Sequence, residues 1–281
     1  MIKQISLWLA RSILVGVGYI IGLMLTGVFF ATLGVRFAIA SQVAEMLPWL
    51  FVGGIVMGLV LGPIAGQLAV SRARHQVIWT CVIFFNIVSV VIEGAFFAPA
   101  QIGSNLPVLV AQQFILAMLT ASAITLLFAP KSNAETILPP RAWYDWLWRL
   151  VVSAASYLVF YFIFGAINYM LVTRPYYESH AGGLAIPSTN TILVAETIRG
   201  MLIVLSVVPF LLSVTKPRRE RVVWTGVILF AIGGIVPLLY QVNVLPIPLL
   251  FVSGVEIFFQ NFSTGIVAAW LLGRLPSRAT P

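Results

Sequence analysis

Charged residues are scarce in this chain of 281 residues. Asp, Glu, Lys and Arg make up 9% of it, whereas a typical soluble domain carries about 25%. Hydrophobic residues make up 60%. This balance excludes an ordinary soluble domain and predicts an integral membrane protein.

Cysteine and histidine are also scarce. Cys81 is the single cysteine, so intramolecular disulfides and cysteine metal clusters are excluded. We predict that His75 and His180 lie in connections between membrane spans, which argues against a haem or a His–carboxylate metal site within the membrane. The sequence contains no H-E-x-x-H, G-x-S-x-G or P-loop pattern. We therefore predict no metal and no cofactor.

Long apolar stretches are abundant. A helix that crosses a bilayer needs about 20 mainly apolar residues, and we find eight such stretches separated by short connections. The sequence thus predicts an all-α integral membrane protein. The predicted spans lie near 12–34, 49–70, 77–98, 108–129, 150–172, 191–214, 222–241 and 249–272.

The two halves of the chain resemble each other. Residues 3–36 align with 141–174 without a gap, and several identities fall on Trp, Arg, Tyr and Gly, which hydrophobic composition alone does not generate. Further along, two prolines each precede a basic residue by nine positions. The matching pairs include Trp8 and Trp146, Arg11 and Arg149, Tyr19 and Tyr157, Gly27 and Gly165, and Pro63 and Pro209.

This similarity predicts a duplicated four-helix unit. We expect one repeat over 1–130 and a second over 150–281, joined by a cytoplasmic linker over 131–149. Since four spans return the chain to its starting side, the two repeats would share one topology. A pseudo-two-fold axis along the membrane normal would then relate them.

A similar aromatic segment precedes the first span of each repeat, at Lys3–Ser12 and Arg141–Leu150. Trp, Tyr and Arg favour the headgroup layer of a membrane. We predict a short interfacial helix at each segment, which anchors the chain or, in an alternative interpretation, docks a partner.

Basic residues are distributed unevenly about the predicted spans. Most of them, from Lys3 to Arg278, flank one side, whereas Arg36 and Arg174 fall on the other. This bias predicts cytoplasmic N- and C-termini, and we place the protein in the plasma (inner) membrane of a prokaryote. The net charge of +8 then reflects topology and contact with anionic lipids. It does not indicate nucleic-acid binding.

Four ionisable residues lie inside the predicted spans, and none has a charged counterpart in the other half. A charge in mid-membrane costs about 2.5–3.5 kcal/mol, so such residues usually face the interior of a bundle and serve as candidate sites. Polar residues at similar depth extend the group. The candidate ligand-binding residues are Glu93, Glu196, Arg199, Glu256, Gln113 and Gln260.

The outer segment Arg174–Gly183 contains Tyr177, Glu178 and His180. A Glu and a His could ligate a metal, but two ligands do not make a site. We predict a solvated loop here.

Two functions remain open from the sequence. The first is a transporter or binding protein for a small or amphipathic solute or lipid. Arg199 would hold an anionic group, and Glu93, Glu196 and Glu256 would complete a cavity between the repeats in the outer half of the bilayer. The second is a non-catalytic subunit of a larger membrane complex, in which Glu196 and Arg199 simply pair with each other. An enzyme is the least favoured class, because no nucleophile–base pair is visible.

Overall fold

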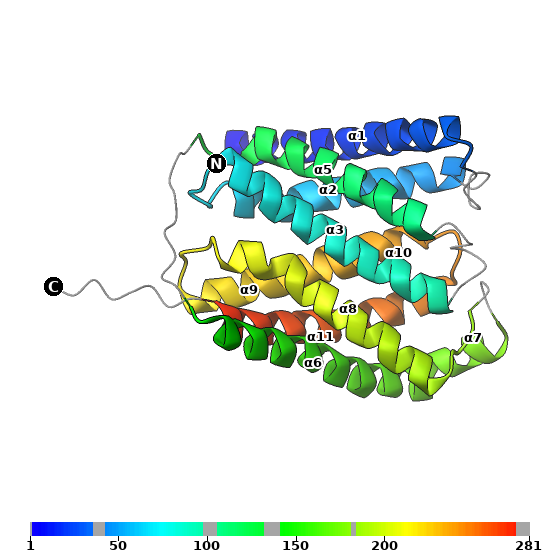
Figure 1. The fold of residues 1–281 in the computed structure, drawn as a ribbon. Coiled ribbons are helices and arrows are strands. Elements are labelled where there is room, and N and C mark those ends of the chain that lie inside the picture. The colour runs from blue at the N-terminus through cyan, green and yellow to red at the C-terminus, as the bar shows by residue number, and fades with distance from the viewer. Residues whose placement is uncertain (1, 36–42, 98–105, 132–140, 181–183, 274–281) are drawn as a thin grey trace.

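The protein is a bundle of long helices (Figure 1). The computed structural model describes residues 2–35, 43–97, 106–131, 141–180 and 184–273. In these ranges, eight helices are long and apolar enough to cross a membrane. The predicted all-helical membrane class and number of spans are therefore confirmed for the described part of the chain.

The helices of the first half are α1 (Ile2–Thr32), α2 (Val43–Ala65), α3 (Arg72–Phe97) and α5 (Leu106–Phe128). The second half begins with α6 (Trp143–Asn168), the π-helical segment η2 (Tyr169–Thr173) and the short α7 (Arg174–Glu178). It continues with α8 (Thr189–Leu211), then α9 (Arg218–Phe230), η4 (Ala231–Ile235) and α10 (Val236–Tyr240), and ends with α11 (Ile247–Leu272). Helices suit a bilayer because each one satisfies its own backbone hydrogen bonds.

Helices of the two halves pack in matching pairs. In the first half α1 packs on α2 and α5, and α3 packs on α5; in the second half α6 packs on α8 and α11, and α9 packs on α11. The halves meet where α3 packs on α8 and where α2 packs on α10. Figure 1 shows the first half above the second, with α1 beginning and α11 ending at the same end of the bundle.

Small residues bring α2 close to α1 in the first half and α8 close to α6 in the second. A Cβ atom on Gly54 would lie 2.8 Å from Gly16 Cα, where α2 meets α1. A Cβ atom on Gly200 would lie 2.7 Å from the Ala154 carbonyl oxygen, where α8 meets α6. Each glycine is nine residues before an aligned proline. Small residues at such crossings let membrane helices approach closely and gain dispersion contacts.

A second pair of contacts lies where α1 and α6 begin. The Arg11 guanidinium carbon is 5.9 Å from the ring centroid of Phe128, near the end of α5. Arg149 Nη1 donates a hydrogen bond of 2.8 Å to the Leu271 carbonyl oxygen, near the end of α11. Both arginines thus join the first helix of a half to its last helix. The internal repeat itself remains a prediction.

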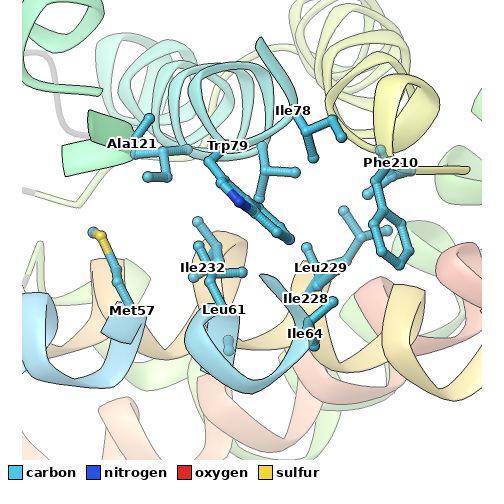
Figure 2. Packing of buried hydrophobic residues seen from close by; sticks show 14 of the residues in the cluster. Met57, Leu61, Ile64, Ile78, Trp79, Ala121, Phe210, Ile228, Leu229 and Ile232 are labelled. Atoms are coloured by element: carbon cyan, nitrogen blue, oxygen red, sulfur yellow. The ribbon is translucent and has the colours of Figure 1, made fainter. Parts of the chain in front are cut away.

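The hydrophobic core is centred between the halves (Figure 2). Trp79 of α3 is fully buried, and its ring centroid lies 6.4 Å from that of Phe210 of α8. Leu61 of α2 and Ile232 of η4 belong to the same cluster. Dispersion contacts of this kind hold helices together in lipid, where the hydrophobic effect contributes little to helix association.

The predicted interfacial helices are wrong as separate elements. α1 begins at Ile2 and α6 at Trp143, and each continues without a break into its span. At 1.5 Å per residue, the 31 residues of α1 extend about 46 Å, which exceeds the roughly 30 Å hydrocarbon core. The aromatic segments are therefore the first turns of the spanning helices.

The predicted location of His75 is also wrong. α3 begins at Arg72, earlier than expected, so His75 lies in its first turn and is fully buried. Its Nε2 lies 3.1 Å from the Leu68 carbonyl oxygen. His180 does lie in a connection, where its backbone has a φ of 53°.

Two π-helical segments interrupt the second half. Each ends two residues before a proline, Pro175 or Pro237. Proline lacks an N–H and clashes with the carbonyl four residues earlier, so the helix must change its hydrogen bonding there. Beyond η2 the chain forms α7 from Arg174 to Glu178. The loop predicted for this part of the segment is thus wrong.

Candidate functional site

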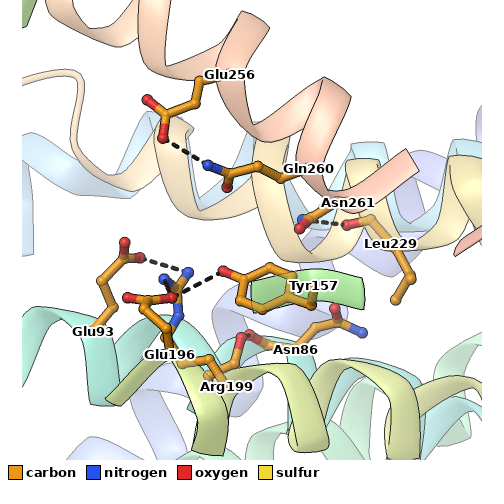
Figure 3. Close-up of polar contacts among 10 residues, drawn as sticks. Asn86, Glu93, Tyr157, Glu196, Arg199, Leu229, Glu256, Gln260 and Asn261 are labelled. Carbon is orange, nitrogen blue, oxygen red and sulfur yellow. Dashed lines mark hydrogen bonds and ion pairs between the residues drawn. The ribbon is translucent and has the colours of Figure 1, made fainter. Parts of the chain in front are cut away.

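Three of the four intramembrane charges form one ion-pair network (Figure 3). Arg199 of α8 places Nη1 2.6 Å from Glu196 Oε2 on the same helix and Nη2 2.7 Å from Glu93 Oε2 on α3. The side chains of Arg199 and Glu196 are 6% and 0% exposed, whereas that of Glu93 is 32% exposed. The network therefore crosses the contact between the halves, with Glu93 at its accessible edge.

Tyr157 of α6 completes this network. Its hydroxyl donates a hydrogen bond of 3.2 Å to Glu196 Oε2, and the Arg199 guanidinium carbon lies 5.6 Å from its ring centroid. The close approach at Gly200 brings α6 near enough for both contacts, because a Cβ there would lie 3.2 Å from Tyr157 Cδ1. We name Glu93, Tyr157, Glu196 and Arg199 the ionic site.

Glu256 of α11 lies in a second polar group. It accepts hydrogen bonds from Asn168 Nδ2 and, at 2.7 Å, from Gln260 Nε2. Gly165 of α6 leaves room for this carboxyl, since a Cβ there would lie 3.2 Å from Glu256 Oε1. Figure 3 shows Glu256 and Gln260 across from Glu93 and Arg199. We name Asn168, Glu256 and Gln260 the amide site.

The two sites share one helix. α6 carries Tyr157, which contacts Glu196 of the ionic site, and Asn168, which contacts Glu256 of the amide site. Beyond Asn168 the η2 segment leads into α7.

Polar contacts continue deeper in the bundle, both between the halves and within the second half. Asn86, seven residues before Glu93 on α3, donates a hydrogen bond of 2.8 Å to Ser206 of α8. Asn261 of α11 donates one of 3.1 Å to the carbonyl oxygen of Leu229, just before the η4 segment. All three side chains are buried. Figure 3 shows Asn86 and Asn261 beside the two sites.

The structure does not bring Gln113 to this region. It lies on α5, which packs on α1, α2 and α3, whereas the ionic site lies where α8 packs on α3 and on α6. Gln113 Oε1 is buried without a hydrogen-bond partner, and no contact joins it to either site within the described ranges. Only its predicted depth in the membrane indicated Gln113 as a site residue. Depth in the membrane does not specify which neighbouring helix a side chain contacts.

Sequence reasoning missed the contribution of α6. Tyr157 served only as a marker of the repeat, and Tyr161 and Asn168 were not singled out. The three lie at i, i+4 and i+11 of one helix, a spacing that places them on a single face. A search for such a polar stripe within an apolar span could have found them.

Where the structure describes the chain, no group of three or more His, Cys, Asp or Glu side chains is placed to hold a metal ion.

Comparisons with protein-family models, with curated protein sequences and with solved structures find no match for this chain. The molecule is a multi-pass helical membrane protein by its architecture.

Proposed function

We propose that this protein transports or binds a small or amphipathic solute or lipid at the ionic and amide sites, in the outer half of the bilayer. The proposal rests on the ion pairing and the exposure of Glu93. Its carboxylate pairs with Arg199 at 2.7 Å, yet its side chain remains 32% exposed within a spanning helix. Charged groups inside membranes are costly and commonly mark substrate or proton pathways.

The buried polar residues beyond the ionic site support a pathway. Asn86 and Ser206 lie about two helical turns from Glu93 and Arg199 on the same two helices. A Glu–Arg pair that only stabilises the fold would not need further polar residues such as Asn86 and Ser206 on the same two helices. Polar side chains at successive depths give a solute alternative hydrogen-bond partners between the halves.

The lipid-facing surface supports a protein that functions alone in the membrane. Every one of the eight spanning helices exposes at least one large apolar side chain. We expect these side chains to contact lipid around the bundle. Examples from successive spans are Leu25, Val52, Val77, Leu126, Val159, Val194, Val223 and Phe251.

We also propose two parallel repeats with cytoplasmic termini in a prokaryotic plasma membrane. The equivalent close approaches at Gly54 and Gly200 support the repeat. Arg72 and Arg218 begin α3 and α9 at the end of the bundle where α1 begins (Figure 1), which supports the orientation by the positive-inside rule.

Co-purification tests the proposed function. The protein would be purified in mild detergent, and its bound small molecules identified by mass spectrometry. The comparison is a neutral variant of similar shape, Glu93→Gln, Glu196→Gln and Arg199→Met combined. We expect a compound that is bound by the parent and lost from this variant, because the variant removes the charges while leaving few buried groups unpaired.

The matched control is Arg174→Met with Glu178→Gln, which removes an exposed ion pair of 2.7 Å outside both sites. This control should retain the compound. Identical bound molecules in the parent and in a well-folded triple variant would contradict the proposal.

A second candidate function is that of a non-catalytic subunit in a larger membrane complex. It is favoured by the pairing of both terminal nitrogens of Arg199 within the chain, which needs no solute. The exposed rings of Trp143 and Tyr144 at the start of α6 offer a surface for a neighbour. Other chains that co-purify in fixed ratio would support this function over the first.

A further inference from the structure

We infer that the site takes the positively charged end of its solute, an ammonium or amidinium group, in place of the anionic group expected from the sequence. This inference rests on the proposed function and specifies the chemical class of its solute.

Arg199 is already occupied by carboxylates. Nη1 and Nη2 lie 2.6 and 2.7 Å from oxygens of Glu196 and Glu93. An anionic solute would have to displace one of them. Displacing Glu196 would leave a fully buried carboxylate without its partner, and breaking such a pair is strongly unfavourable. A cationic solute can bind without disturbing this pair.

The charge balance also favours a cation. Two carboxyls, those of Glu93 and Glu196, share the single guanidinium of Arg199, and the third, Glu256, has only the amide donors of Asn168 and Gln260. Uncompensated charge is costly in a low-dielectric environment. A positive group near Glu93 and Glu256 would compensate the excess carboxylates.

Unpartnered acceptors mark where such a group would donate. Glu196 Oε1 and Asn168 Oδ1 have no hydrogen-bond partner, although their side chains are 0% and 7% exposed. Asn168 already donates to Glu256, so its free oxygen belongs to the amide site. An ammonium group supplies three donors. One donor, Arg199 Nε, is also unpartnered, but the free acceptors outnumber it.

Aromatic residues precede Asn168 on α6 and pack on one another or on α11. The rings of Tyr157 and Tyr161 lie 6.4 Å apart, and those of Phe164 and Phe259 stack at 5.2 Å. Ring faces attract organic cations, and most strongly where water is excluded. Aromatic side chains on this part of α6 suit a cation with an apolar body, an amphipathic amine.

Three ligands of equal chain length would test this inference: decylamine, decanoate and decanol. Binding would be measured by calorimetry on the full chain in phosphatidylcholine nanodiscs, whose zwitterionic lipid limits non-specific binding of amines. We expect saturable binding of decylamine alone, at least tenfold weaker in Glu93→Gln and in Glu256→Gln. The Glu256→Asp variant, which keeps the charge, should retain binding, as should the exposed control Glu178→Gln.

Two outcomes would overturn the inference. Saturable binding of decanoate that is lost in Arg199→Met would show that the site takes anions, and the proposed function would stand. Binding of decylamine that is unchanged in both Gln variants would place the amine elsewhere. The co-purification experiment judges the proposed function separately, since it does not depend on the charge of the solute.

Discussion

The α6–α8 crossing, which carries Glu196 and Arg199 of the ionic site, differs in chemistry from the α1–α2 crossing of the first half. Tyr157 beside Gly200 corresponds to Tyr19 beside Gly54, and both tyrosines are almost fully buried. On α8 the residue before Gly200 is Arg199, whereas on α2 the residue before Gly54 is Gly53. One contact is therefore ionic, and the other has no charge at the equivalent position.

An aromatic ring occupies the space at the α1–α2 crossing. A Cβ atom on Gly53 would lie 2.8 Å from Cε1 of Tyr240, on α10. The rings of Tyr240 and Tyr19 stack with centroids 6.2 Å apart. The same helix crossing is thus compatible with a stacked pair of tyrosines or with an ion-pair network. Because the α1–α2 crossing packs without any charge, packing alone does not explain the Glu196–Arg199 pair at the α6–α8 crossing.

The largest expected loss of stability comes from removing the guanidinium group of Arg199. Arg199→Met leaves the buried Glu196 and the half-buried Glu93 without their partner. Breaking a buried ion pair in this way costs about 3–5 kcal/mol. The free energy of unfolding in mixed micelles should fall by that amount.

The triple variant Glu93→Gln, Glu196→Gln and Arg199→Met serves as the control, and it should recover most of the loss because no buried charge remains unpaired. If the triple variant is as unstable as the single one, the loss reflects packing of the long Arg199 side chain.

A smaller loss of stability, similar in size in the two halves, is expected where α1 crosses α2 and where α6 crosses α8. Gly54→Ala and Gly200→Ala each place a methyl group within 2.8 Å of a neighbouring helix's backbone. Overpacking of this kind costs about 1–3 kcal/mol. Thermal unfolding in detergent should show similar losses for the two variants. A loss in one variant only would argue against equivalent crossings.

The smallest expected change in stability is at Gly27 and Gly165, which align in the sequence but have different surroundings. A Cβ on Gly27 would meet nothing within 4 Å, so Gly27→Ala should stabilise its helix by up to about 1 kcal/mol through helix propensity. Gly165→Ala should gain less, because its methyl group would lie 3.2 Å from Glu256 Oε1. It should also weaken decylamine binding in calorimetry, whereas Gly27→Ala should not. Equal solute binding in the two variants would show that Gly165 does not shape the amide site.

The charged residues of the candidate site could be predicted from their positions inside apolar stretches of the sequence. Glu93, Glu196, Arg199 and Glu256 are conspicuous because ionisable residues are rare and costly inside apolar spans, and Gln260 follows Glu256 by one helical turn. Their pairing could not be predicted in the same way. Glu93 lies far from Arg199 in the chain, and only the contact of α3 with α8 brings them within 2.7 Å.

The sequence by itself determined the membrane class and the eight spanning helices, because the length of an apolar run and the backbone's need for internal hydrogen bonds are local properties. Only the tertiary structure decided which polar side chains meet. It placed Gln113 on α5, away from both sites, and brought Tyr157 and Asn168 into contact with Glu196 and Glu256. Helix neighbours depend on the fit of whole surfaces at small residues such as Gly200, and no local pattern specifies that fit.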